Sequence, residues 1–218
     1  VHSVESNFGS FAKTEDPEIL PHYAKFYNII SELAAAKLAS DFQNDSDTDF
    51  LECFFGCLFK YAKYIPQVLN EQIHLNLQVA QKCIETNDLE LAKTVCLFLE
   101  YLLKQCNDNP QNDIQKVKFS LNKKSFNCRK MLTEVFVGQY GEIIFKELIS
   151  KLMIQPLNQK LRNYIQDVIF ASLRRLQKNT LEWLEVAFQQ VEINSDDLIK
   201  TLGEIDFGNF NDENDEAV

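Results

Sequence analysis

Apolar residues recur at steps of three and four along most of the chain, which is the pattern of helices that bury one face. In one segment, for example, Phe50, Phe54 and Leu58 fall on a single stripe. The spacing predicts helices over residues 15–40, 49–64, 67–85, 88–106, 128–154, 157–176, 180–191 and 195–205. Only six Gly and five Pro occur, too few for the many turns of a sandwich or barrel of short strands. The sequence therefore predicts an all-α chain.

Helix-breaking and capping residues place the boundaries. Pro66 and Pro156 interrupt the apolar periodicity. Asp88 follows a short polar turn and is a candidate N-cap, Asn179-Thr180 is predicted to start the 180–191 helix, and Ser195 is predicted to cap the last helix.

Three parts are predicted along the chain. Residues 1–14 form a flexible N-terminal segment, residues 15–205 hold helical repeats, and residues 206–218 form an acidic disordered tail. Within the repeats, residues 107–124 make a polar connector with room for a short helix at 114–121. The chain starts with Val, and we expect it to be a piece of a longer protein; its start does not resemble a signal peptide.

Consecutive predicted helices group into pairs of about 40 residues, the period of HEAT-type repeats. A single pair cannot cover its own apolar face, so neighbouring pairs stack and share a core. The predicted architecture is an α-α superhelix, that is, a HEAT/ARM-like solenoid of stacked antiparallel helix pairs. A compact helical bundle is the alternative.

Two glycines stand in the middle of the predicted 128–154 helix. Gly138 and Gly141 each disfavour a helix by up to about 1 kcal/mol relative to Ala. Either a neighbouring helix approaches closely at this point, or the helix bends there.

Charge narrows the classes of partner. The 218 residues carry a net charge of −10, but residues 111–180 hold 13 basic and 5 acidic side chains. An acidic chain is a poor binder of nucleic acid and favours a basic protein partner. The alternative is that the acidic residues only keep solvent-exposed helix faces hydrated. No apolar run approaches the roughly 20 residues of a membrane span, so we predict no membrane partner.

Residues with catalytic or metal-binding chemistry form no recognisable motif. The six cysteines lack CxxC spacing and read as buried structural thiols, including Cys53 and Cys57 on one helix face. The Asp45-x-Asp47-x-Asp49 run resembles the opening of a calcium loop, but Phe50 and Gly56 stand where such a loop needs Gly and Glu. We therefore predict no enzyme activity, no cofactor and no metal.

One enzyme hypothesis stays open beside these predictions. It places a catalytic site built from distant residues around Cys96 or His74.

Several runs resemble the late helices of the importin-β superfamily, in the branch that holds transportin-3 and importin-13. They are DFLECFF at 49–55, YIP at 64–66, AKTVCLFL at 92–99, QYGEIIF at 139–145 and LEWLE at 181–185. The resemblance covers about residues 15–200. The basic group of Arg174, Arg175 and Lys178 does not match the cargo-reading basic helix of that branch.

This resemblance implies the C-terminal HEAT repeats of a nuclear transport receptor, a karyopherin that moves between cytoplasm and nucleus. It implies protein cargo held on a concave surface, most readily a basic nuclear protein. It also implies FG nucleoporins as partners, and Ran-GTP bound by N-terminal repeats that this chain would lack. The alternative is a helical-repeat scaffold or adaptor unrelated to nuclear transport.

The resemblance also implies that the second helix of each pair lines the concave side, which selects the helices at 67–85, 128–154 and 180–191. Their polar positions are then the candidate partner-binding residues: Glu71, Gln78, Glu134, Glu182, Glu185 and Gln189. The glutamates would attract a basic partner, and the glutamines would hydrogen-bond to it.

Overall fold

A computed structural model describes residues 18, 20–39, 45–86, 88–106, 130–154, 158–205 and 207. Its regular elements are α2 (Leu20–Ala39), α3 (Asp45–Tyr64), the 3₁₀-helix η1 (Pro66–Glu71), α4 (Ile73–Glu85), α5 (Leu89–Gln105), the π-helix η3 (Phe136–Tyr140), α8 (Gly141–Ile154), α9 (Gln159–Gln190) and α10 (Asp196–Glu204). All regular elements within these ranges are helical, which confirms the predicted all-α class. The predicted segment 1–14, the connector 107–124 and, except for Phe207, the tail 206–218 lie outside the described residues.

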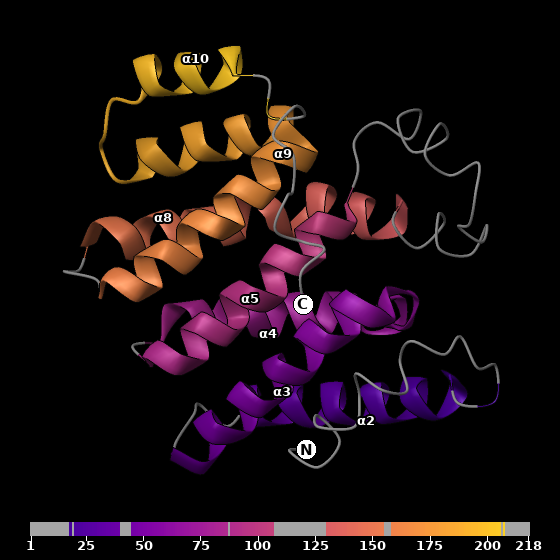
Figure 1. The fold of residues 1–218 in the computed structure, drawn as a ribbon. Helices are drawn as coiled ribbons and strands as arrows, with labels where there is room; N and C mark the ends of the chain where they lie inside the picture. The colour runs from indigo at the N-terminus through magenta and orange to yellow at the C-terminus, as the bar shows by residue number, and fades with distance from the viewer. Residues whose placement is uncertain are drawn as a thin grey trace.

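The helices pack as antiparallel pairs that follow one another from α2 at one end to α10 at the other (Figure 1). In the first pair the Tyr23 ring lies 6.4 Å from the Tyr61 ring, so the start of α2 meets the end of α3. At the opposite end of this pair, the Lys37 Nζ atom of α2 lies 2.5 Å from the Asp47 carboxylate in the first turn of α3. These two contacts fix the antiparallel direction of the pair.

Two rows of helices run through the stack. We call α2, α4, α8 and the second half of α9 the first row, and α3, α5 and the first half of α9 the second row. Within the second row the helices are parallel, because Phe55 of α3 contacts Phe98 of α5 and Phe59 contacts Tyr101 one turn later.

The first row is parallel as well. His74, near the start of α4, packs on Tyr140, just before α8. About three turns further along both helices, Lys151 of α8 donates a 2.8 Å hydrogen bond to the carbonyl oxygen of Ile84. Lys151 also donates to the carbonyl oxygen of Thr86, so its ammonium group covers carbonyls at the C-terminal end of α4.

Buried apolar side chains form one continuous cluster from Tyr27 in α2 to Ala187 in α9. A few polar groups inside it are hydrogen-bonded, as burial requires. The Tyr27 hydroxyl donates to the Leu69 carbonyl at 2.8 Å and accepts from the Asn76 amide at 2.6 Å. Burial raises the pKa of Tyr27, so this hydroxyl stays protonated and can keep donating.

Three predicted boundaries differ from the structure. Helix α3 begins at Asp45, within the stretch that reads as a connector, because buried Asp47 pairs with Lys37 in its first turn. The predicted 67–85 helix is a 3₁₀ segment followed by α4 from Ile73. At the start of α10, Ser195 holds the N-cap position without a side-chain bond, and the Asn194 side chain accepts the N–H of Asp196 instead.

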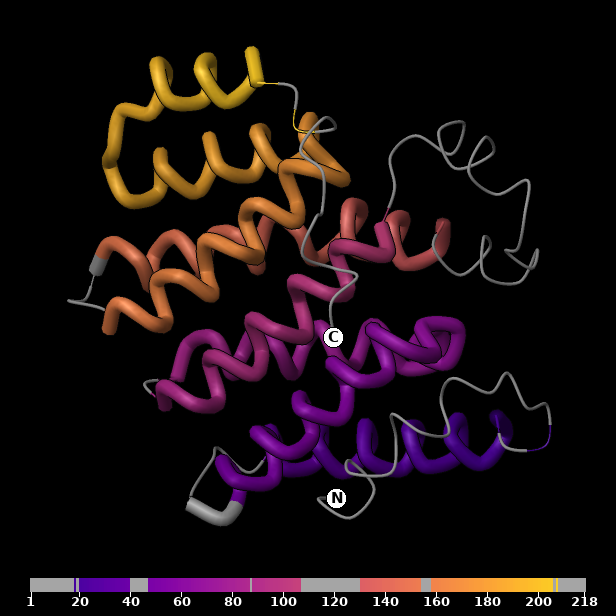
Figure 2. The backbone as a smooth tube through the Cα atoms, in the orientation of Figure 1, coloured from indigo at the N-terminus to yellow at the C-terminus, as the bar shows by residue number. Residues whose placement is uncertain are grey.

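The predicted helices at 157–176 and 180–191 lie in one continuous helical element, α9, whose two halves meet at a kink (Figure 2). The kink lies where the first of the two predicted helices ends. The backbone leaves the helical region at Leu176, with φ −135° and ψ 42°. Thr180 does not cap a new helix. Its hydroxyl donates to the Leu176 carbonyl at 2.8 Å and lies 2.6 Å from the Ser172 hydroxyl, which joins the two halves across the kink.

The two mid-helix glycines have different roles. At Gly141 a β-carbon would come within 2.3 Å of the Trp183 indole, so this glycine allows the second half of α9 to approach α8 closely. Trp183 is buried there between the rings of Phe136 and Phe145. Gly138 has no neighbouring atom within 4 Å of its β-carbon position and lies in the π-helical turn η3. Close approach therefore explains Gly141 but not Gly138.

We expect Gly141→Ala to destabilise the fold by about 1–3 kcal/mol, because the new methyl group cannot fit without moving a packed indole. The matched control is Gly138→Ala, which has open space and should cause no loss. Trp183 is the only tryptophan of the chain, so urea unfolding followed by its fluorescence measures both variants. Equal unfolding midpoints would show that the indole moves aside freely.

Candidate protein-binding surfaces

All six residues predicted to bind a partner are exposed in the structure. Glu71 ends η1, Gln78 lies on α4, Glu134 lies on the helical turn before η3, and the other three lie on the second half of α9. The helices that carry them are neighbours in the first row. With α2 and α3 as the first pair, each of these helices is the first of its pair and not the second, as the prediction had it. Whether this row forms a concave side stays a prediction.

The six residues do not form one uniform cluster. Glu182, Glu185 and Gln189 are separated by three and four residues, so the helix repeat brings them onto one exposed face of α9. Gln78 lies beside Tyr140 at the end of η3, where it lowers the pKa of that tyrosine against the rise that burial causes. Glu71 is turned toward α2, where it accepts a 2.5 Å hydrogen bond from the Asn28 amide.

Glu134 pairs with Lys130 at 3.7 Å one turn earlier on its own helix, and both side chains are largely exposed. An exposed ion pair of this kind contributes little to stability, so either partner is able to interact with another molecule. The surface with the strongest acidic character among the predicted residues is therefore the α9 face of Glu182 and Glu185.

The second row carries a surface that sequence reasoning missed. The ammonium groups of Lys63 and Lys104 lie 5.6 and 4.7 Å from the ring centre of Tyr101, and Lys60 lies 5.5 Å from that of Phe59. Next to Lys104, a cavity of about 290 Å³ opens between α5 and α9. It is lined by Glu100, Lys104, Asp167, Phe170, Ala171, Arg174 and Arg175.

The charges around this cavity influence one another. Lys104 forms a 3.0 Å ion pair with Glu100 one turn earlier. Partial desolvation raises the pKa of Asp167, and the nearby Lys104 opposes that rise. Phe170 leaves 52% of its surface exposed while its ring contacts Phe207 at 6.3 Å. A ring this exposed, beside several cations, can contact a partner.

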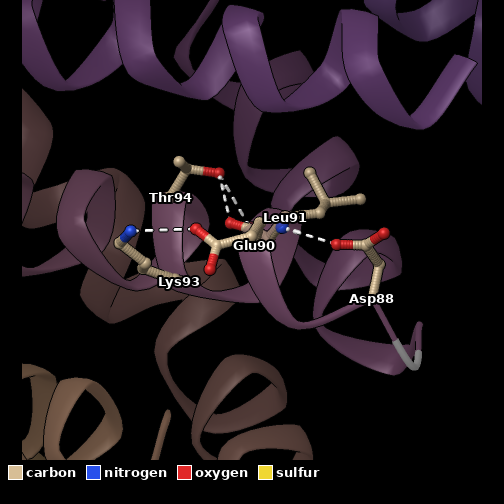
Figure 3. Close-up of polar contacts among 5 residues, drawn as sticks. All are labelled: Asp88, Glu90, Leu91, Lys93 and Thr94. Atoms are coloured by element: carbon tan, nitrogen blue, oxygen red, sulfur yellow. Dashed lines mark hydrogen bonds and ion pairs between the residues drawn. The ribbon is translucent and has the colours of Figure 1, made fainter. Parts of the chain in front are cut away.

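A second cavity, of about 430 Å³, lies between the first turns of α5 and α9. Its lining residues are Leu89, Glu90, Lys93, Lys160, Leu161, Asn163 and Tyr164. Figure 3 shows how the α5 turn is fixed: the predicted N-cap Asp88 accepts the N–H of Leu91 at 2.8 Å, and Glu90 pairs with Lys93 at 2.9 Å. The hydrogen bond to Glu90 raises the pKa of Lys93. The Asp88 cap and the Glu90–Lys93 ion pair together satisfy the polar groups of this turn from within α5.

Cys96, the thiol of the open enzyme hypothesis, lies in unsuitable surroundings for nucleophilic chemistry. Cys96 is 2% exposed, and burial raises the pKa of the Cys83 and Cys96 thiols to about 12. A nucleophilic cysteine needs the opposite, a lowered pKa and access to solvent. His74 is exposed and packs on the Tyr140 ring. Cys128 lies outside the described residues.

Within the described ranges, no group of three or more His, Cys, Asp or Glu side chains is arranged to hold a metal ion. No described helix combines the length and the apolar character needed to cross a bilayer. The sequence matches no known family model, and comparisons with curated proteins and with solved structures gave no match either.

We expect Cys83 and Cys96 to resist iodoacetamide at neutral pH while the protein is folded, because both thiols are buried and protonated. Half-buried Cys53 should react faster, and urea should make all three reactive. Peptide mapping by mass spectrometry separates the sites. Rapid labelling of Cys96 in the folded protein would instead support a catalytic thiol.

Proposed function

We propose that this chain is a HEAT-like helical-repeat module that binds a protein partner on its surface and works within a nuclear transport receptor. The first part is supported by the two rows of parallel helices, since stacked antiparallel pairs with a shared core are the arrangement of such repeats. The second part rests on the resemblance of the runs at 49–55, 92–99, 139–145 and 181–185 to the importin-β superfamily.

The observation that carries the binding role is the exposed polar face on the second half of α9. Glu182 and Glu185 lie on a helix whose opposite side is fixed by buried Trp183, so the acidic groups are held on a rigid support. A preorganised acidic face favours a basic partner and mainly speeds its association, in a manner that salt weakens. In the proposed receptor the partner is a basic nuclear protein carried as cargo between cytoplasm and nucleus.

Two features of such a receptor remain part of the proposal. Binding to FG nucleoporins would let the module cross the pore, and Ran-GTP would act through N-terminal repeats outside this chain. The second candidate function is that of a helical-repeat scaffold with no role in transport. The same fold is compatible with either function.

We expect Glu182→Lys combined with Glu185→Lys to weaken binding of a fluorescent Lys/Arg-rich peptide by about tenfold at low salt, because the charge of the face is reversed. The matched control, Glu32→Lys combined with Glu204→Lys, changes net charge equally at exposed sites elsewhere. It should change the dissociation constant less than twofold. Equal losses in both variants would mean that only net charge matters, and would rule out this face.

The two candidate functions differ in one binding property. A transport receptor module should be retained on immobilised FG-repeat peptide and not on a control peptide in which Ser replaces each Phe. We expect retention of the wild-type chain. A chain that binds the basic peptide but passes the FG column unretained would favour the scaffold.

A further inference from the structure

Helix α2 is the end helix of the first row (Figure 1). Its buried side, with Tyr27, Ile30 and Ala34, packs on the rest of the stack. Its outer side carries two large apolar side chains, Ile29 and Leu33, which leave 47% and 50% of their surfaces exposed. They are four residues apart, so the helix repeat places them next to one another on the surface.

These two residues belong to a longer apolar stripe. Half-buried Phe26 lies three residues before Ile29, and exposed Ala36 lies three residues after Leu33. We call these four residues the α2 stripe. Steps of three, four and three residues are the spacing of a seam along which two helices pack. A single exposed apolar residue needs no explanation, whereas a continuous stripe indicates a contact surface. The other large exposed apolar side chains of the described residues are spread over three helices: Ile143, Met153, Phe170 and Leu198.

Two charged residues flank one side of the α2 stripe. Lys25 and Glu32 are both exposed and lie seven residues apart, which is about two helical turns, so they share one side of the helix. Exposed lysines elsewhere pair with a glutamate three or four positions away, as Lys82 does with Glu85. No residue of opposite charge stands at that spacing from Lys25 or Glu32. Neither can therefore form such an ion pair within α2.

The apolar and charged positions are nearly symmetric about Ile29. Phe26 lies about 4.5 Å before Ile29 along the helix axis, and Leu33 lies about 6 Å after it. Lys25 lies about 6 Å before Ile29, and Glu32 lies about 4.5 Å after it. A second α2 helix related by a twofold axis at Ile29 runs antiparallel and places its Leu33 opposite Phe26.

The same twofold axis also pairs the charges. In an antiparallel pair of helices, one side of the first helix meets the same side of the second. Lys25 of each copy then lies opposite Glu32 of the other, so two ion pairs form together. The apolar stripe and the flanking charges therefore specify the same register, and a second copy of this chain satisfies both.

We propose that the α2 stripe is a self-association surface through which two copies of the chain pair antiparallel along α2. Ile29 lies at the centre of the contact, and two Lys25–Glu32 ion pairs flank it. A few turns of one helix bury less than the roughly 1,200–2,000 Å² of a stable interface, so we expect a dissociation constant on the order of 10–100 µM.

This association does not depend on the proposed function. The acidic face of Glu182 and Glu185 lies on the second half of α9, toward the opposite end of the stack (Figure 1). A dimer joined along α2 leaves that face open in both copies. Glu32→Lys therefore remains a valid control for the binding of a basic peptide to α9.

Sedimentation equilibrium of the full chain, over about two decades of concentration around the expected dissociation constant, tests the proposal. Lys25→Glu and Glu32→Lys each set like charges opposite one another in both pairs. Each variant alone should therefore dimerise at least about tenfold more weakly than the wild type. An equimolar mixture of the two variants should form a heterodimer within about threefold of the wild-type affinity, because opposite charges face each other again.

The matched controls lie on other helices. Lys160→Glu and Glu204→Lys change the same charges at exposed sites, and each should dimerise within about twofold of the wild type. Ile29→Asp should abolish the dimer, whereas Leu198→Asp, at an equally exposed apolar residue of α10, should leave it unchanged. Circular dichroism in urea checks that each variant folds. If Ile29→Asp does not fold, Ile29→Ser replaces it, with Leu198→Ser as its control.

Three results would overturn the proposal. The first is a wild-type chain that stays monomeric at every concentration, which would mean that another part of the chain or a different protein covers the α2 stripe. The second is a dimer that the Ile29 variant leaves intact. The third is a mixture of Lys25→Glu and Glu32→Lys that associates no more tightly than either variant alone, since the charge pairing requires this rescue.

Discussion

The structure depends on the fact that no helix pair here can bury its own apolar side. Phe55 of α3 packs on Phe98 of the next pair, and Trp183 packs on Phe136 and Phe145 next to Gly141. Each pair therefore completes the burial of its neighbour, and one apolar cluster extends from α2 to α9. The same requirement forces equivalent helices to run parallel in each row, and this direction decides which surface residues meet.

Much of the fold could be predicted because helical periodicity is a local property of the sequence. The positions of α2, α4, α5 and α10 follow from apolar spacing and from breakers such as Pro66. The irregular points could not be predicted, because tertiary contacts decide them. Asn179-Thr180 has the residue types of a helix start, but the Thr180 hydroxyl bonds to Leu176 and lies beside Ser172 instead. The kink itself lies at Leu176, where the first of the two predicted helices ends, and only the cap at Thr180 was wrong.

Of the candidate surfaces, too, one part could be predicted from the sequence and another part could not. Exposure of Glu182, Glu185 and Gln189 was predictable, since three- and four-residue spacing sets the outward face of a helix. The basic residues of the second row were not predictable as a group. Lys63 and Lys104 share the Tyr101 ring, and Lys104 and Arg174 line one cavity, only because three helices lie side by side. The excess of basic residues over 111–180 was a partial signal, but it could not show which cations share an edge.

The kink in α9 also determines how the end of the stack is held together. The first half of α9 belongs to the second row and the second half to the first row, and no loop separates them. Helix α10 follows residues 191–195, and the Gln177 side chain just after the kink donates hydrogen bonds to the carbonyls of Leu202 and Ile205, so the end of α10 is held against the start of the second half of α9. Arg174 and Arg175 stand directly before that bend. The change of row at Leu176 therefore sets the Arg174–Arg175 pair and the Glu182–Glu185 pair on different rows of the stack, although the two pairs are close in sequence.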